Sequence, residues 1–170
     1  KITFNFEQFF PENDPDLEYY KKFTAEFEKD DNFLLIAVKN NEKSVYDTSF
    51  LKKINSLTDS LFSIQSIQKV QSLTNLKTPV KTPFGYTLVP TLHISDNEKL
   101  REDIVRIQND ERFKNNFIND KGNALAILIK TKDDLNMDQN DSLIKAVKTI
   151  IINHNIPEEN YHFLGKSFFQ

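Results

Sequence analysis

The sequence predicts an α+β domain with the ferredoxin-like, split-βαβ pattern (βαββαβ), in which an antiparallel sheet is built from elements in the order β-α-β-β-α-β. Two runs, FLLIAV at 33–38 and ALAILI at 124–129, are wholly apolar and short, which is typical of buried strands. Each run is followed by a segment with helical apolar spacing and then by a more polar strand. The chain of 170 residues is long enough for one domain with a substantial core.

Residues 1–32 precede this pattern and predict a leading segment, rich in phenylalanine, followed by an extra N-terminal helix. Asp14 is placed to cap that helix, and Pro15 fits its first position, where a missing N–H costs nothing. Apolar side chains then recur at helical spacing, at Leu17, Tyr20, Phe23 and Phe27.

Residues 33–75 form the first βαβ half of the predicted sheet. After the apolar run, Asp47 or Thr48 is placed to cap a helix. A more polar strand is predicted at 67–73. The apolar stripe of the helix consists of Phe50, Leu51, Ile54, Leu57 and Leu61.

Residues 76–118 form an insertion between the second and third strands. Prolines and a glycine predict an irregular segment at 76–96, with at most a short extended piece. Ser95 and Glu98 have the spacing of a capping box, which predicts a helix after them. Its buried stripe is expected to contain Leu100, Ile104 and Ile107.

Residues 119–170 form the second βαβ half, with a turn at 120–123 before the second apolar run. A helix is predicted from Met137 to His154, with a stop at Asn155 and Pro157. The last strand is predicted at 161–168.

The ferredoxin-like strand order, four-one-three-two, places both apolar runs at the centre of the sheet and the two polar strands at its edges. Because the central strands are apolar on both faces, the face without helices needs a second cover. We expect the first helix, the insertion or a partner domain to provide it.

Four residues of the insertion are candidate contact residues: Phe84, Tyr86, Leu88 and Val89. Loops on rigid scaffolds carry function more often than the elements they connect. These side chains can line a substrate path or form a subunit contact, or they can pack on the open face of the sheet. We favour the packing interpretation.

The sequence indicates no catalytic residue, cofactor or metal site. It contains no cysteine, and His93, His154 and His162 lack the spacing of metal ligands. Residues 134–141 resemble a calcium loop but lack its central glycine and final glutamate, so we interpret their acidic groups as helix N-terminal charge. A net charge of −3 without a basic stripe argues against nucleic-acid binding.

Several segments together resemble the extracytoplasmic domains of RND-superfamily, MMPL-type membrane transporters. Residues 9–27 (FFPENDPDLEYYKKFTAEF) are similar to the segment that follows the first transmembrane helix in that family. Residues 70–75 (VQSLTN) are similar to its V-x-S-L-T-N unit, and residues 117–130 (FINDKGNALAILIK) to its L-I-S-x-D-G-x-A hairpin and strand. Gly165–Phe169 stands where the family often has Gly-x-Pro-Tyr, but the proline is missing here.

The resemblance implies a non-catalytic porter domain on the periplasmic side of a bacterial inner membrane, within a proton-driven exporter of lipids or other hydrophobic molecules. It implies as partners the transmembrane part, a second periplasmic domain and further copies of the parent protein. The proton-relay carboxylates of the family lie in transmembrane helices, and no apolar run here approaches the length of about 20 residues that spans a bilayer. The first residue is Lys, not Met, so we expect a piece of a larger protein.

Two other interpretations stay open. A free-standing ferredoxin-like ligand-binding or regulatory module would have a closed pocket with convergent polar groups. An enzyme would need a cleft with perturbed titratable groups. A porter domain instead predicts that the chain enters and leaves at the same end of the fold.

Overall fold

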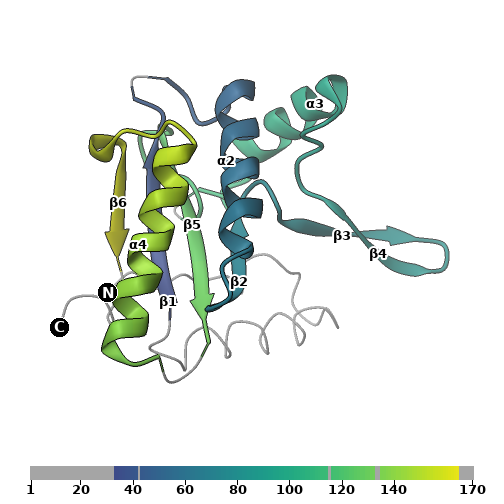
Figure 1. Ribbon diagram of the computed structural model, residues 1–170. Coiled ribbons are helices and arrows are strands. Elements are labelled where there is room, and N and C mark those ends of the chain that lie inside the picture. Colours follow the sequence, from purple (N-terminus) through teal and green to yellow (C-terminus); the bar gives the residue numbers. More distant parts are fainter. Residues whose placement is uncertain (1–32, 42, 115, 133–134, 165–170) are drawn as a thin grey trace.

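The computed structural model describes residues 33–41, 43–114, 116–132 and 135–164. This part of the chain is an α+β domain with a four-stranded antiparallel sheet and a separate two-stranded sheet (Figure 1). The predicted leading segment, the extra N-terminal helix and the Gly165–Phe169 motif lie outside the described residues.

The four-stranded sheet has the spatial order β2-β5-β1-β6, and each strand is antiparallel to its neighbours. The strands are β1 (Phe33–Lys39), β2 (Ile67–Ser72), β5 (Ala124–Thr131) and β6 (Tyr161–Leu164). The two apolar runs are therefore the central strands and the two polar ones are the edges, so this part of the prediction is confirmed. Strand β6 is described only to Leu164.

One face of the sheet is covered by helices α2 (Thr48–Phe62) and α4 (Met137–Asn153), which lie side by side in front of it (Figure 1). Ile36 of β1 pairs with Ile127 of β5, and neither is exposed to solvent. Four more side chains of these strands share that face and are buried: Leu34, Val38, Leu125 and Ile129.

The other face of the central strands is also buried. Leu35 and its partner Leu128 are 5% and 7% exposed. More polar side chains accompany them on the neighbouring strands, such as Gln71, which pairs with Leu128. Continuous apolar runs thus correspond to strands that are covered on both faces, as expected for such runs.

The helix ends follow their local sequence. The Asp47 carboxylate accepts a hydrogen bond from the Phe50 amide (3.0 Å), which confirms Asp47 as the cap of α2. Asn136 caps α4 in a capping box with Gln139. Asn155 adopts φ 54° just after α4, and the Ile156 amide bonds back to the Ile151 carbonyl, which is the Schellman stop.

Helix α3 (Asn97–Gln108) begins one residue later than predicted, so the Ser95–Glu98 capping box is wrong. The Asp96 carboxylate accepts hydrogen bonds from the Glu98 and Lys99 amides instead. A carboxylate at this position satisfies two free N–H groups and also interacts favourably with the positive end of the helix dipole.

The segment 76–96 is not irregular, because most of it forms a β-hairpin of β3 (Lys77–Thr82) and β4 (Gly85–Pro90). Prolines within this segment suggested the wrong structure. Both strands of a two-stranded sheet are edge strands. An edge strand tolerates proline at positions where the backbone N–H of another residue would point outwards, because no ladder hydrogen bond is lost there. Pro79 accordingly sits within β3, opposite Leu88.

The pairing of the central strands predicts a large cost for truncation there. We expect Ile36→Ala to lower the free energy of unfolding by about 2–5 kcal/mol, because it leaves a cavity beneath α2 and α4. Urea denaturation of the chain measures this. The matched control is Ile152→Ala on α4, whose side chain is 62% exposed and whose truncation should change stability by about 0.5 kcal/mol or less. Equal losses in both variants would contradict the assignment of the core.

Candidate interaction site

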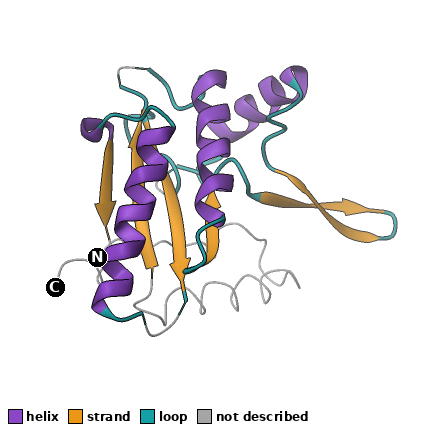
Figure 2. Cartoon of the chain, viewed as in Figure 1, coloured by secondary structure: helices purple, strands orange, loops and turns teal. Residues whose placement is uncertain are grey.

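The hairpin formed by β3 and β4, residues 77–90, projects away from the four-stranded sheet (Figure 1; the long twisted strand pair in Figure 2). Its two strands pair only with each other and form a sheet of their own. Both of its long edges therefore carry backbone groups that have no strand partner among the described residues. An exposed hairpin of this kind is a common place for one protein to contact another.

The structure places the four predicted residues at three positions on the hairpin. Phe84 is at the tip and is 100% exposed. Tyr86 and Leu88 lie on one face of β4 and are 53% and 59% exposed, while Val89 is half-buried on the opposite face. The packing interpretation is wrong for Phe84, Tyr86 and Leu88, because none of them covers the sheet.

One face of the hairpin, which we call the apolar face, carries Tyr86, Leu88 and Pro90 from β4 and Pro79 from β3. Residues directly opposite in an antiparallel pair share a face, and Leu88 pairs with Pro79. Tyr86 pairs with the exposed Lys81. Large apolar side chains grouped on an exposed surface are typical of a binding surface.

The tip of the hairpin is a two-residue loop of Pro83 and Phe84. The Thr82 hydroxyl donates to the Gly85 carbonyl (2.8 Å) and accepts from the Phe84 amide (3.3 Å). Gly85 has φ +120°, a conformation that side chains rarely adopt. Local hydrogen bonds therefore hold Phe84 at the outermost point of the hairpin.

The base of the hairpin is fixed through Thr91, which is 1% exposed. The Thr91 amide donates to the Leu76 carbonyl (2.9 Å), and its hydroxyl bonds to that of Thr78 (2.8 Å). Its carbonyl accepts a hydrogen bond from the Arg106 guanidinium (2.7 Å). These contacts join both strands of the hairpin to helix α3.

Asp103 holds this base together from α3. Its carboxylate accepts hydrogen bonds from the amide and Nδ1 of His93 (2.8 Å each) and from Arg106 (2.7 Å). Burial alone would raise the pKa of Asp103, but the hydrogen bonds and the Arg106 charge outweigh it, and the pKa lies below its usual value. The sequence does carry a signal for this role, since Asp103 lies on the buried stripe of α3 between Leu100 and Ile107.

The segment at 70–75, which resembles the family motif, contains the end of strand β2 at Ser72. The Asn75 side chain accepts from the Ser72 amide (2.8 Å) and donates to the Val70 carbonyl (2.9 Å). The buried Ser72 hydroxyl bonds to those of Thr58 (3.0 Å) and Thr74 (2.7 Å), which fastens the strand end to α2.

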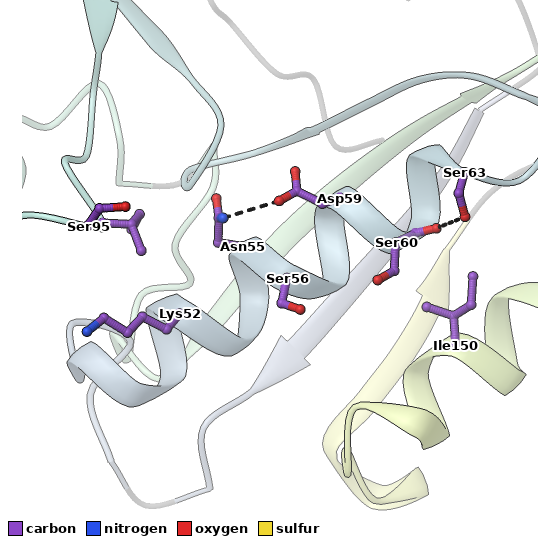
Figure 3. Close-up of a pocket in the computed structure, with 9 residues that line it drawn as sticks. Lys52, Asn55, Ser56, Asp59, Ser60, Ser63, Ser95 and Ile150 are labelled. Atoms are coloured by element: carbon purple, nitrogen blue, oxygen red, sulfur yellow. Dashed lines mark hydrogen bonds between the residues drawn. The ribbon is translucent and has the colours of Figure 1, made fainter.

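A polar groove runs along α2 towards α4 and the loop before α3 (Figure 3). It is shallow, and it is lined by Lys52, Asn55, Ser56, Asp59, Ser60, Ser63, Ile94, Ser95 and Ile150. At its α4 side, His154 Nδ1 lies 2.8 Å from the Ile150 carbonyl, and Nε2 lies 3.2 Å from the Ser56 hydroxyl. These contacts join the end of α4 to α2.

The other two histidines have different surroundings from His154. His93 is hydrogen-bonded to Asp103, and His162 is exposed on β6. Among the described residues, no group of three or more His, Asp or Glu is arranged to hold a metal ion. None of the helices in the described ranges has the length and apolarity needed to cross a membrane.

Comparison with known proteins gives no assignment. No protein-family model matches the chain, and no curated protein matches it.

The lowered pKa of Asp103 predicts how stability depends on pH. We expect Asp103→Asn to cost about 1.5–3 kcal/mol of unfolding free energy at pH 7, because His93 and Arg106 lose a charged acceptor. An unfolded aspartate titrates near pH 4. The difference in unfolding free energy between the unchanged chain and the Asp103→Asn variant is therefore fully present above about pH 4. It shrinks as the pH falls through the lower folded-state pKa.

Denaturation of both proteins between about pH 3 and pH 7 measures this difference. Asp59→Asn, on the exposed side of α2, serves as the control and should change stability by about 0.5 kcal/mol or less. A stability difference for Asp103→Asn that stays constant over this range would contradict the role of its carboxylate.

Proposed function

We propose that this chain is a porter-type domain of an RND/MMPL-type exporter, facing the periplasm from a bacterial inner membrane and carrying no chemistry of its own. In this proposal it contributes to the path of a lipid or other hydrophobic substrate and to contacts with the rest of the transporter. The proposal rests on the sequence resemblance together with three features of the described residues.

The first feature is the strand order. Without the insertion, the elements run β1-α2-β2-β5-α4-β6, and the sheet order β2-β5-β1-β6 is entirely antiparallel. If β1, β2, β5 and β6 are numbered one to four in chain order, the sheet read from β6 to β2 has the order four-one-three-two. We therefore propose a ferredoxin-like core, as the resemblance implies for a porter domain.

The second feature carries the proposal. Strands β1 and β6 are antiparallel neighbours, and Leu35 pairs with Leu164. The start of β1 and the end of β6 therefore lie at the same end of the sheet, about 5 Å apart at the paired Cα atoms. A domain inserted between two membrane-spanning segments needs this arrangement, because its chain must leave the membrane and return to it.

The third feature is the hairpin. Strand β2 runs parallel to β1, so the insertion leaves the sheet at the end opposite to Phe33 and Leu164. In the proposed orientation it departs from the end remote from the membrane. Phe84 and the apolar face are then available to a neighbouring domain, another copy or a hydrophobic substrate.

The alternative, a free-standing binding module, predicts an enclosed pocket with convergent polar groups. The groove along α2 is instead open to solvent and shallow. The groove along α2 therefore does not favour this alternative over the porter domain.

The side of the membrane can be tested by cysteine labelling of the full-length protein. The chain has no cysteine, so Thr87→Cys, on the exposed side of the hairpin opposite the apolar face, introduces a unique thiol here. With cysteines elsewhere in the protein replaced, we expect a membrane-impermeant maleimide to label it in spheroplasts with intact inner membranes. Labelling that requires lysis would contradict the proposed location. A cysteine in a cytoplasmic marker protein is the control.

The role of the hairpin can be tested by export of a lipophilic fluorescent dye. We expect Phe84→Ser with Leu88→Ser to slow export by the full-length protein about ten-fold, because buried aromatic anchors dominate contact energies. The matched control combines Val105→Ser and Ile152→Ser, whose side chains are 58% and 62% exposed outside the hairpin. Equal effects of both double variants, or no effect of either, would contradict the contact role.

A further inference from the structure

A second groove lies at the end of the sheet where β1 ends and β6 begins. Its lining residues come from three separate parts of the chain and share a nitrogen-bearing side chain: Lys39, Asn40, Asn41, Lys43, Asn123 and Asn160. The two lysines are exposed and carry positive charge. Every one of these side chains can donate a hydrogen bond, and none of them is acidic.

Asn160 is the one buried side chain among the residues that line this groove. It is only 7% exposed, and its side-chain amide has no hydrogen-bond partner among the described residues. A buried amide without a partner is costly, and nearly all such groups in proteins are paired. A ligand in the groove would supply the missing acceptor.

Two more side-chain amides at this groove connect the loops, and each has a second N–H that is available to donate a hydrogen bond. The Asn40 side chain donates to the Ser44 carbonyl (2.7 Å), and that of Asn123 donates to the Asn41 carbonyl (3.4 Å). Each amide nitrogen carries two hydrogens, so each has one left beyond the bond named.

The groove is held in shape by backbone contacts between the loop after β1 and the turn before β5. The Asn40 amide donates to the Asn123 carbonyl (2.8 Å), and the Val45 amide to the Gly122 carbonyl (2.9 Å). Asn41 adopts φ 46° and Gly122 φ 64°, the tight conformations that bring these loops together. Donors held in place before binding lose little freedom when a ligand arrives.

We propose that this groove binds a small oxyanion, a phosphate or carboxylate group, held by Lys39 and Lys43 and by the buried Asn160 amide. Oxyanions accept charge-assisted hydrogen bonds from ammonium and amide donors, and they match a groove that has donors and positive charge. The groove is at the end of the sheet opposite to Phe33 and Leu164. The proposed site is argued only from the residues of this groove, so it goes beyond the proposed transporter role and does not depend on it.

The proposal can be tested on the chain by NMR titration with sodium phosphate and, separately, with sodium acetate. Sodium chloride at equal ionic strength gives the baseline. We expect saturable shifts of the Asn160 and Asn123 side-chain amide signals with at least one oxyanion, and the stronger of the two identifies the preferred group. Shifts no larger than those in sodium chloride would overturn the proposal.

Variants separate a specific site from general attraction of anions. We expect Lys39→Gln with Lys43→Gln to weaken binding about ten-fold or more, because both ammonium donors are lost. Asn160→Asp should abolish binding, since it places a carboxylate where the ligand binds. Because Asn160 is buried, that variant counts only if its NMR spectrum remains that of a folded chain; the exposed lysines provide the independent test.

Lys52→Gln is the matched control, because Lys52 is an exposed lysine on α2 that lines the other groove. It should bind phosphate or acetate as the unchanged chain does. Equal affinity of the Lys39→Gln, Lys43→Gln double variant and the unchanged chain would overturn the proposal, as would equal weakening by Lys52→Gln.

Discussion

The antiparallel pairing of β1 with β5 is the constraint on which the other elements depend. Both strands are apolar on both faces, and water would have to hydrate that surface if either strand lay at an edge. Their pairing leaves β2 and β6 as the edges and gives α2 and α4 a common apolar face to cover. The pair Ile36 and Ile127, fully buried beneath these helices, lies in the middle of this arrangement.

The same pairing separates the two ends of the sheet. The chain enters at Phe33 and leaves at Leu164 at one end, while the insertion and the amide-lined groove occupy the other. Among the described residues, no side chain of the hairpin belongs to the hydrophobic core. The hairpin is thus free to expose Phe84 and its apolar face, and only its base at Thr91 must be fixed.

The buried polar side chains Asp103, Ser72 and Asn160 differ in whether they have hydrogen-bond partners within the described residues. Asp103 and Ser72 are satisfied by several partners each and join the insertion and the end of β2 to neighbouring helices. Such networks are stabilising only when every member is paired. Asn160 lacks such a partner among the described residues and lines a groove, which is why it points to a ligand and Asp103 does not.

The sequence by itself determined the four strands of the larger sheet, the helices and the central position of the two apolar runs, because hydrophobic periodicity is a local property of the chain. It did not determine strands β3 and β4 of the hairpin. It also limited the cap of α2 to Asp47 or Thr48 and placed the stop at Asn155, because caps and stops depend on neighbouring residues only. The tertiary structure alone decided that Phe84, Tyr86 and Leu88 are exposed, since whether an apolar residue packs depends on where its segment projects. It also decided which amides meet at the groove, because Lys39, Asn123 and Asn160 are distant in sequence and come together only through the pairing of β1 with its two neighbours.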